Sequence, residues 1–259
     1  MNAFHSLWTK PANGREPETF ELLTMVLSAL KWREKNGSIC LVTDSAGFEY
    51  IKEKGLLGCW NSVLKDLDNI PREVDCKRFW AAGKIYALKA FETPVVSVDT
   101  DFIVWESLGL ENIRSELCAI HRESLNRNVY PDVPEFTMYD DGFSWEVLPL
   151  NAAFLYFGNA KLKDEYVRYA ESVMTTCNWG DTLQPMVFAE QRILAMTAEK
   201  LGIVPHVFSS LEKLNSGSDE RFTHLWGFKN QLKQNEALKN EFTEKLRNRI
   251  KTDFPDINI

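Results

Sequence analysis

The chain has 259 residues, enough for one large α/β domain or two small ones. Its 44% hydrophobic and 26% charged residues are ordinary for a globular protein, and its net charge of −7 argues against a nucleic-acid-binding function. No apolar run approaches the roughly 18 residues of a membrane span, and the first residues lack the features of a signal peptide, so a cytoplasmic protein is expected. The five cysteines, an odd number without CxxC spacing, are interpreted as reduced thiols rather than zinc ligands or disulfides.

The beginning of the chain predicts a strand–helix–strand unit. Apolar residues favour a strand over 3–8, helical spacing favours a helix over 17–35, and a second buried strand is expected over 38–43. Ligands of such sheets bind beyond the carboxyl ends of the strands, which makes Asp44 a candidate site residue. Further along we expect a short helix, an edge strand and a longer helix, over 47–56, 60–67 and 77–91.

The next predicted strand leads into two aspartates. A β-branched run after Pro94 is typical of a buried strand, Asp99-Thr100-Asp101 follows it, and another apolar run begins at Phe102. An unpaired carboxylate is costly to remove from water, so two carboxylates beside buried strands require a cation, and a divalent metal satisfies both. Oxygen ligands suit Mg²⁺ or Mn²⁺, which also bind the phosphate oxygens of substrates.

An Asp-x-Asp sequence alone is weak evidence for a metal site. With 14 aspartates in the chain, about one such pair is expected by chance, and a second copy occurs at Asp66 and Asp68 in a polar turn. The pair at Asp99 and Asp101 differs in context, because it follows a predicted buried strand and a helix that carries Lys84. The metal hypothesis is therefore restricted to Asp99 and Asp101.

The second half of the chain gives weaker signals. No structure is assigned between 108 and 139. One or two strands are expected within 144–157, a short strand over 203–208 and a flexible loop over 209–221. Helices are expected over 162–174 and 185–201, and a long charged helix after Lys229 that ends near Ile250. The expected organisation is one domain over 1–229, with a basic helical tail, 230–259, packed on it.

His224 is the candidate for a third metal ligand, because an imidazole shifts the preference from Mg²⁺ toward Mn²⁺. Gly227 and Lys229 follow closely, and a glycine lets a phosphate approach the backbone while a lysine supplies a point charge. The alternative for an isolated histidine is a hydrogen-bonded structural role. That is the interpretation of the remaining histidines, His5, His121 and His206.

Motifs of several common enzyme classes are missing: G-x-S-x-G, G-x-x-x-x-G-K-[ST] and G-x-G-x-x-G do not occur. What the chain does contain is an ordered series of short motifs: Asp44, Lys84, Asp99-Thr100-Asp101, Asn151, Glu190-Gln191 and His224-x-x-Gly227-x-Lys229. Over 4–229 this series resembles the GT-A fold glycosyltransferases. It is most similar to a bacterial group of largely uncharacterised glycosyltransferase-like proteins, and distantly to the retaining galactosyl- and glucosyltransferases that include glycogenin.

The resemblance implies an α/β fold with a mixed central sheet and a nucleotide-sugar donor, usually a UDP-sugar. It also implies a Mn²⁺ or Mg²⁺ ion that bridges the donor diphosphate, with Asp99, Asp101 and His224 as its ligands. Gly227 and Lys229 would hold the diphosphate, and Lys229 would stabilise the charge on the departing UDP.

The remaining site residues are also implied by the resemblance. Lys84 would contact the donor, Asn151 would lie near the sugar, and Gln191 and Glu190 would act with Lys229 at the reacting centre. Asp99 would also lie near the ribose. The nucleoside pocket would be lined by Ser6, Leu7, Trp8 and Asp44.

Three positions depart from the pattern of these relatives. They usually have Asn-x-Gly where this chain has Asn151-Ala152-Ala153, and Asp where it has Glu190. The retaining enzymes commonly have two residues between the glycine and the lysine of the last motif, where this chain has one. These departures leave the donor sugar and the stereochemical outcome open.

Two other functions are compatible with the same residues: a nucleotide-sugar-binding protein without activity, and a metal-dependent nucleotidyl or phosphoryl transferase. The stretch 229–251, with seven Lys or Arg against three Glu, also has two interpretations. One is a solvated helix packed on the domain, and the other is docking on the anionic inner face of a membrane. The expected acceptor is a carbohydrate or a lipid-linked molecule, in surface-polysaccharide synthesis or a related pathway.

Overall fold

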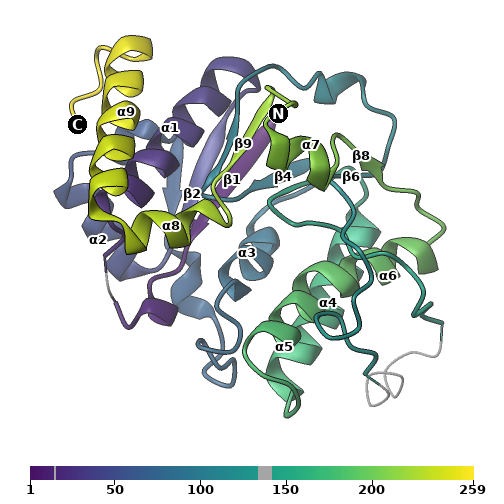
Figure 1. Ribbon diagram of the computed structural model, residues 1–259. Helices are drawn as coiled ribbons and strands as arrows, with labels where there is room; N and C mark the ends of the chain where they lie inside the picture. Colours follow the sequence, from purple (N-terminus) through teal and green to yellow (C-terminus); the bar gives the residue numbers. More distant parts are fainter. Residues whose placement is uncertain (15, 134–141) are drawn as a thin grey trace.

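The computed structural model describes residues 1–14, 16–133 and 142–259, and it contains one large sheet with helices on both faces (Figure 1). The sheet has the strand order β3-β2-β1-β4-β7-β6-β8, and β5 and β9 form a separate pair. β1 is parallel to β2 and β4, whereas β7 is antiparallel to β4 and β6, so the predicted α/β fold with a mixed sheet is confirmed. The strands are β1 Asn2–Leu7, β2 Ile39–Thr43, β3 Ser62–Leu64, β4 Val95–Val98, β5 Phe102–Val104, β6 Leu117–Ala119, β7 Phe154–Phe157, β8 His206–Val207 and β9 Phe222–His224.

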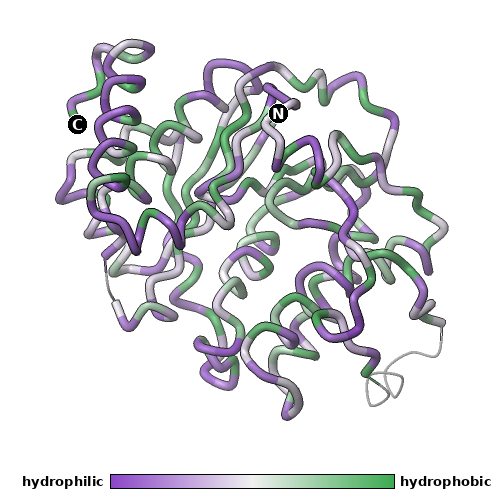
Figure 2. The backbone as a smooth tube through the Cα atoms, in the orientation of Figure 1, coloured by the Kyte–Doolittle hydropathy of each residue, from purple (hydrophilic) through white to green (hydrophobic). Residues whose placement is uncertain are grey.

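The sheet divides the hydrophobic core into two layers. Neighbouring residues of a strand point to opposite faces, so Val95 packs with residues of α3, α4 and α6, and Val96 packs with residues of α1, α2 and α9. Figure 2 shows hydrophobic residues concentrated along the strands, whereas α9 is largely hydrophilic. The α-helices are α1 Thr19–Lys35, α2 Ser45–Glu53, α3 Ala82–Ala87, α4 Ala160–Thr176, α5 Leu183–Val187, α6 Ile193–Lys200, α7 Leu211–Ser216, α8 Phe228–Gln234 and α9 Glu236–Asp253.

The predicted strand–helix–strand unit is present as β1, α1 and β2, with boundaries close to those expected. The helix begins at Thr19, because Glu18 and Glu21 form a reciprocal capping box at its first turn. The parallel register pairs Leu7 with Thr43, and Phe4 with Ser97 of β4. The carboxyl ends of β1, β2 and β4 therefore lie side by side along one border of the sheet, and the candidate site residues begin there.

The predicted helix over 77–91 is wrong in its first five residues, since α3 begins only at Ala82. The carboxylate of Asp75 accepts hydrogen bonds from the backbone N–H groups of Lys77 and Arg78. Such local side-chain bonds offer the backbone an alternative to the helix. The segment before α3 is consequently built of turns.

The expected flexible loop over 209–221 contains a helix, α7. Its N-terminus is capped by Ser210, whose hydroxyl accepts from the N–H of Lys213, and it ends at Gly217 in the left-handed conformation (φ 67°). Both cap residues were visible in the sequence, but six polar-rich residues gave too short a periodic pattern to predict a helix.

Other differences in the second half concern continuity. The helix predicted over 185–201 is interrupted by a π-helical turn, Phe188–Arg192, between α5 and α6. Of the strands expected within 144–157, β7 forms at its end, and β9 was not predicted. The strand expected over 203–208 is present only as the two residues of β8, His206 and Val207. β8 and β9 are set by pairing with distant segments, β6 and β5, rather than by local pattern.

The long helix expected after Lys229 is two helices. Asn235 is extended (φ −129°, ψ 99°) between them, and its side chain accepts from the N–H of Leu238 as the N-cap of α9. The expected domain boundary after Lys229 therefore falls inside α8. α9 packs along α1 (Figure 1). The buried ammonium of Lys31 in α1 pairs with Asp253 of α9 at 2.6 Å.

The basic side chains over 229–251 are largely paired with carboxylates. Lys233 pairs with Glu21 at 2.8 Å and Lys239 with Glu18 at 3.2 Å, so two of these pairs fix the tail to the start of α1. This favours the packed-helix interpretation over membrane docking. Among the described residues, no helix combines the length and the apolar character needed to cross a bilayer.

His5 lies fully buried in β1, in a chain of hydrogen bonds. The indole N–H of Trp60 can only donate, so its 3.3 Å bond makes Nδ1 of His5 the acceptor and leaves the proton on Nε2. Nε2–H then donates to Oγ of Ser28 at 3.1 Å, and that hydroxyl donates to the carbonyl of Phe102 at 2.5 Å. Burial lowers the pKa of His5 from 6.5 to about 3, despite the attraction of Asp101, so the folded protein holds a neutral imidazole.

This neutral imidazole predicts an acid-sensitive fold. Below pH 6.5 the unfolded chain binds a proton at His5 that the folded protein does not bind until about pH 3, so stability falls as the pH falls through this window. Between pH 7 and 5 we expect His5 to account for a loss of about 2 kcal/mol in the free energy of unfolding. Urea unfolding at both pH values, for the natural chain and for His5→Gln, measures this loss. Parallel pH profiles for the two proteins would contradict it.

Candidate functional site

The turn between β4 and β5 carries the two aspartates of the metal hypothesis. The N–H of Asp99 donates to the carbonyl of Ala153 at 2.8 Å, and the N–H of Phe102 donates to the carbonyl of Asp99 at 3.0 Å. This turn lies at the edge where β1, β2 and β4 end, and the side chain of Asp101 is buried while that of Asp99 is partly open to solvent.

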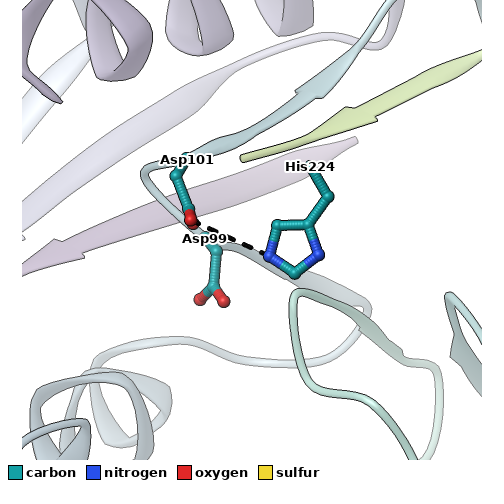
Figure 3. A group of neighbouring side chains, drawn as sticks. All are labelled: Asp99, Asp101 and His224. Atoms are coloured by element: carbon teal, nitrogen blue, oxygen red, sulfur yellow. Dashed lines mark ion pairs between the residues drawn. The ribbon is translucent and has the colours of Figure 1, made fainter. Parts of the chain in front are cut away.

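The pairing of β5 with β9 brings His224 to this turn. Phe102 lies opposite His224 in the antiparallel register, and the N–H of Leu225 donates to the carbonyl of Asp101 at 3.1 Å. Figure 3 shows the result: the imidazole and both carboxylates face a common space, with Nε2 of His224 3.8 Å from Oδ2 of Asp101. The three residues proposed as ligands from the sequence thus lie together.

The donor set fits a divalent metal. Asp99, Asp101 and His224 each offer one ligand atom, and these atoms all lie within 4.8 Å of one another. With metal–oxygen bonds of about 2.1 Å, ligands on opposite sides of an ion are about 4.2 Å apart, so small side-chain shifts would complete the site. Burial lowers the pKa of His224, although Asp101 and Asp99 oppose this, and a neutral imidazole has the lone pair that a metal requires.

Two lysines form ion pairs with these aspartates, one lysine with each. Nζ of Lys84 lies 2.6 Å from Oδ1 of Asp99 and 2.6 Å from Oε1 of Glu190, and it also donates to the carbonyl of Ala152 at 2.9 Å. Nζ of Lys229 lies 2.7 Å from Oδ2 of Asp101. In these two ion pairs, one carboxylate oxygen of each aspartate is bound by a lysine. The other oxygen of each aspartate is not part of the pair.

Burial and charge act in opposite directions at this cluster. Burial disfavours the ammonium of Lys84, but the carboxylates of Asp99 and Glu190 outweigh it and raise its pKa. Burial favours the neutral form of Asp101, but Lys229 and His224 hold its pKa below the usual value. For Glu190 burial prevails over the nearby Lys84, and its pKa is raised. Lys84 and Asp101 are thus charged at neutral pH.

A π-helical turn presents Glu190 and Gln191 to the site. π-Helical turns are rare and occur frequently at functional sites, because the extra residue changes the direction of the following side chains. The hydroxyl of the buried Tyr166 donates to the carbonyl of Glu190 at 2.9 Å, and the N–H of Leu150 donates to that of Gln191 at 3.3 Å. These bonds fix the turn against α4 and the segment before β7.

Tyr130 is a site residue that the sequence analysis missed. Its hydroxyl donates to Oε1 of Gln191 at 2.6 Å, and burial raises its pKa, so it remains a proton donor. Because Oε1 accepts this hydrogen bond, the NH2 group of the Gln191 amide faces away from Tyr130. An isolated tyrosine in a segment without periodicity gave no signal for this role.

Asn151 and Asp44 have structural partners. The amide of Asn151 donates to Glu123 at 2.8 Å and accepts from the N–H of Ala153 at 3.0 Å. Asp44 is the N-cap of α2, and its carboxylate accepts from the N–H of Gly47 at 2.9 Å and from both the N–H and hydroxyl of Thr9. Asp44 lines neither of the two cavities described next.

Two cavities meet at the cluster. The larger, about 330 Å³, is lined by most of the residues singled out from the sequence: Ser6, Leu7, Trp8, Lys84, Asp99, Asp101, Asn151, Glu190, Gln191, His224 and Lys229. The smaller, about 260 Å³, shares Leu7, Trp8, Asp101 and Lys229 with it and continues toward Phe20 at the start of α1. Gly227 lines neither cavity, and a side chain there would meet nothing within 4 Å.

The buried pair of Lys84 and Glu190 predicts a non-additive effect on stability. Lys84→Met should cost about 3–5 kcal/mol of unfolding free energy, because it leaves buried carboxylate charge without its partner. Adding Glu190→Gln should recover part of that loss, which urea unfolding at pH 7 can measure. Lys89→Met, which breaks the exposed pair with Glu171, is the control and should cost less than about 1 kcal/mol. Additive effects of Lys84→Met and Glu190→Gln would contradict the prediction.

Several solved structures similar to this one are glycosyltransferases. The PaToxG glycosyltransferase matches with a TM-score of 0.50 and 13% identity, over 94% of this chain and 78% of that chain. Mouse xyloside xylosyltransferase 1 has a TM-score of 0.46 and 12% identity, over 86% and 97%. The galactosyltransferase LgtC, in complex with donor and acceptor sugar analogues, has 0.40 and 11%, over 74% and 71%. The PaToxG match identifies the fold as that of the GT-A glycosyltransferases, as expected from the resemblance.

Sequence comparisons give a second assignment. No curated protein sequence matches this chain significantly. Residues 1–138 match a family of unknown function, DUF6734, in a region that includes Lys84, Asp99 and Asp101 and ends before His224. Since this match covers more than half of the chain, the protein belongs to the family of unknown function DUF6734.

Proposed function

We propose that this protein is a metal-dependent glycosyltransferase that moves a sugar from a nucleotide diphosphate donor, a UDP-sugar, to a carbohydrate or lipid-linked acceptor. The observation that carries the proposal is the cluster of Asp99, Asp101 and His224 beside Lys229, at the junction of two cavities. A donor of this kind has three parts, a nucleoside, a diphosphate and a sugar. The smaller cavity is proposed to bind the nucleoside, the charged cluster at the junction to bind the diphosphate, and the larger cavity to bind the sugar.

The main barrier of such a transfer is the departure of a diphosphate from an electron-deficient sugar carbon. A Mn²⁺ or Mg²⁺ ion held by Asp99, Asp101 and His224 would supply positive charge to the diphosphate. Lys229 contributes a second positive charge next to Asp101, and it can turn to the diphosphate without leaving the site. The site therefore has what a departing UDP requires.

The residues near the sugar favour retention of configuration. Inversion needs a free base for the acceptor, but Glu190 is bound to Lys84 at 2.6 Å and the amide of Gln191 cannot act as a base. Gln191 is proposed to face the anomeric carbon, held by Tyr130, and Asn151 to bind a sugar hydroxyl. In this scheme no protein base is required, because the departing diphosphate can accept the proton of the acceptor.

A specific observation also favours a binding protein without activity. Both aspartates are already neutralised in part, Asp99 by Lys84 and Asp101 by Lys229, at 2.6 and 2.7 Å. A site with this compensation could bind a nucleotide diphosphate through its lysines alone. The two functions differ in whether donor turnover depends on the aspartates.

Asp101→Asn should separate these alternatives. For an active enzyme we expect hydrolysis and transfer from a UDP-sugar with Mn²⁺ to fall by more than about 100-fold, because the variant loses a ligand charge at the diphosphate. Calorimetry should show weaker Mn²⁺ binding in the presence of UDP. Asp66→Asn, in the other Asp-x-Asp sequence, is the matched control and should change neither quantity. Failure of the natural chain to bind any UDP-sugar would overturn the proposal, and release of pyrophosphate from a nucleoside triphosphate would favour a nucleotidyltransferase.

Tyr130→Phe tests the orientation of Gln191. The variant loses one hydroxyl and its 2.6 Å hydrogen bond, so the amide is free to rotate. We expect kcat for transfer to fall by about tenfold, the effect of losing one well-placed hydrogen bond, while the Kd for the donor stays within about twofold. A proportional loss of donor affinity would instead assign Tyr130 to donor binding.

A further inference from the structure

Two tryptophans are exposed in the described part of the chain, and both line the larger cavity. Trp80 is 47% exposed and Trp226 is 58% exposed, whereas Trp32 and Trp60 are fully buried in the core. Burying an indole would contribute favourably to folding, so leaving two of them in water at one site requires another reason. Exposed aromatic surface beside a cleft is typical of a ligand-binding site.

The two tryptophans lie on the segments that carry the charged site residues. Trp80 precedes Lys84 by four residues in the turns before α3, and Trp226 follows His224 by two residues between β9 and α8. The ring of Trp226 is nearly parallel to that of His224, with centroids 6.4 Å apart and planes 20° apart. Two separate elements therefore contribute flat apolar faces to the same cavity.

The polar part of this lining is rich in groups that bind hydroxyls. Asn151, Gln191 and Glu190, which the proposed function places beside the donor sugar, lie in the same lining as the two indoles. A pyranose ring matches this combination, because it has an apolar face of C–H groups and a rim of hydroxyls. A lipid chain would need a continuous apolar groove, and the amides and carboxylates interrupt one here.

We propose that Trp80 and Trp226 form the acceptor site, and that the acceptor presents a pyranose ring that stacks on these indoles. This inference rests on the proposed function, since it names the acceptor of that reaction. A hydroxyl of the stacked sugar forms a bond to the anomeric carbon of the donor sugar as the bond from that carbon to the diphosphate breaks. The bonding electron pair and the hydroxyl proton both pass to the diphosphate, which leaves as UDP.

The test compares binding of simple sugars with binding of the donor. Methyl pyranosides and short oligosaccharides are titrated into the full-length protein with Mn²⁺ and UDP, and binding is followed by saturation-transfer NMR. Trp80→Ala and Trp226→Ala should each weaken pyranoside binding, and raise the KM for the acceptor, by about tenfold, the loss of one aromatic stacking contact. The Kd for the UDP-sugar should change by less than about twofold.

Three further variants complete the design. Trp80→Phe and Trp226→Phe keep an aromatic face and should recover most of the pyranoside binding. Val204→Ala removes an exposed apolar side chain that lines neither cavity, and should change nothing.

The possible results are distinguishable. A loss of donor affinity equal to the loss of pyranoside affinity would assign the tryptophans to the donor and overturn the inference. Unchanged pyranoside binding in both alanine variants, or no pyranoside binding by the natural chain when UDP is bound, would also overturn it. Absence of UDP-sugar binding by the natural chain would instead contradict the proposed function, and pyranoside titration without UDP would then still decide whether the two indoles hold a sugar.

Discussion

The short antiparallel pairing of β5 with β9 is the interaction on which the site depends. Three residues on each side suffice to bring His224 beside Asp101, although more than 120 residues separate them in the chain. The pairing is stabilised by aromatic packing, since Phe102 stacks on Phe222 and contacts His224 edge-on. The hydroxyl of Ser28 binds the carbonyl of Phe102 and ties the same ribbon to α1. The proposed metal ligands thus rest on a rigid base rather than on free loops.

Charge balance explains how so many ionisable groups can share one partly buried place. Asp99, Asp101 and Glu190 supply up to three negative charges, against two positive charges from Lys84 and Lys229, while His224 is neutral. With all three carboxylates ionised the cluster carries one net negative charge, and the proposed divalent ion would reverse this sign. A diphosphate would then be the complementary ligand, because its negative charges would meet the ion and Lys229 together. The fold tolerates the cluster without a ligand because the lysines prevent a bare buried carboxylate.

Local pattern was sufficient to predict the parts of the fold that local pattern determines. β1, α1, β2 and β4 were predicted because each combines a continuous apolar sequence with a clear boundary, and the position of Asp99 and Asp101 followed from β4. β9 could not be predicted, since three residues carry no periodicity and the strand exists through its partner β5. The same reason hid Tyr130, whose role depends on a partner, Gln191, about 60 residues away.

Asp44 has a structural role that the sequence analysis did not anticipate. It was predicted as a candidate site residue because it follows a buried strand, but the backbone of the following helix also needs an acceptor at its first turn. Asp44 serves that need and also binds Thr9, so one residue at the strand edge fixes both α2 and the chain after β1. Asp99 differs because no helix follows it. Its carboxylate is left to side chains, and that distinction between a capping and a free carboxylate could be made from the sequence that comes after each strand.

Close packing links the wall of the cavities to the charged cluster. A side chain at Gly83 would place its Cβ 2.9 Å from Cβ of Trp8, so a glycine is needed where α3 contacts the chain after β1. Trp8 lines both cavities, and Lys84 is the next residue after this contact. The close contact of α3 with Trp8 therefore positions both the indole that lines the cavities and the backbone of Lys84, whose side chain binds Asp99 and Glu190. Because the backbone of α3 and the side chain of Trp8 are in close contact, neither can shift without moving the other, so the cavity wall at Trp8 and the charged cluster at Lys84 keep a fixed relation.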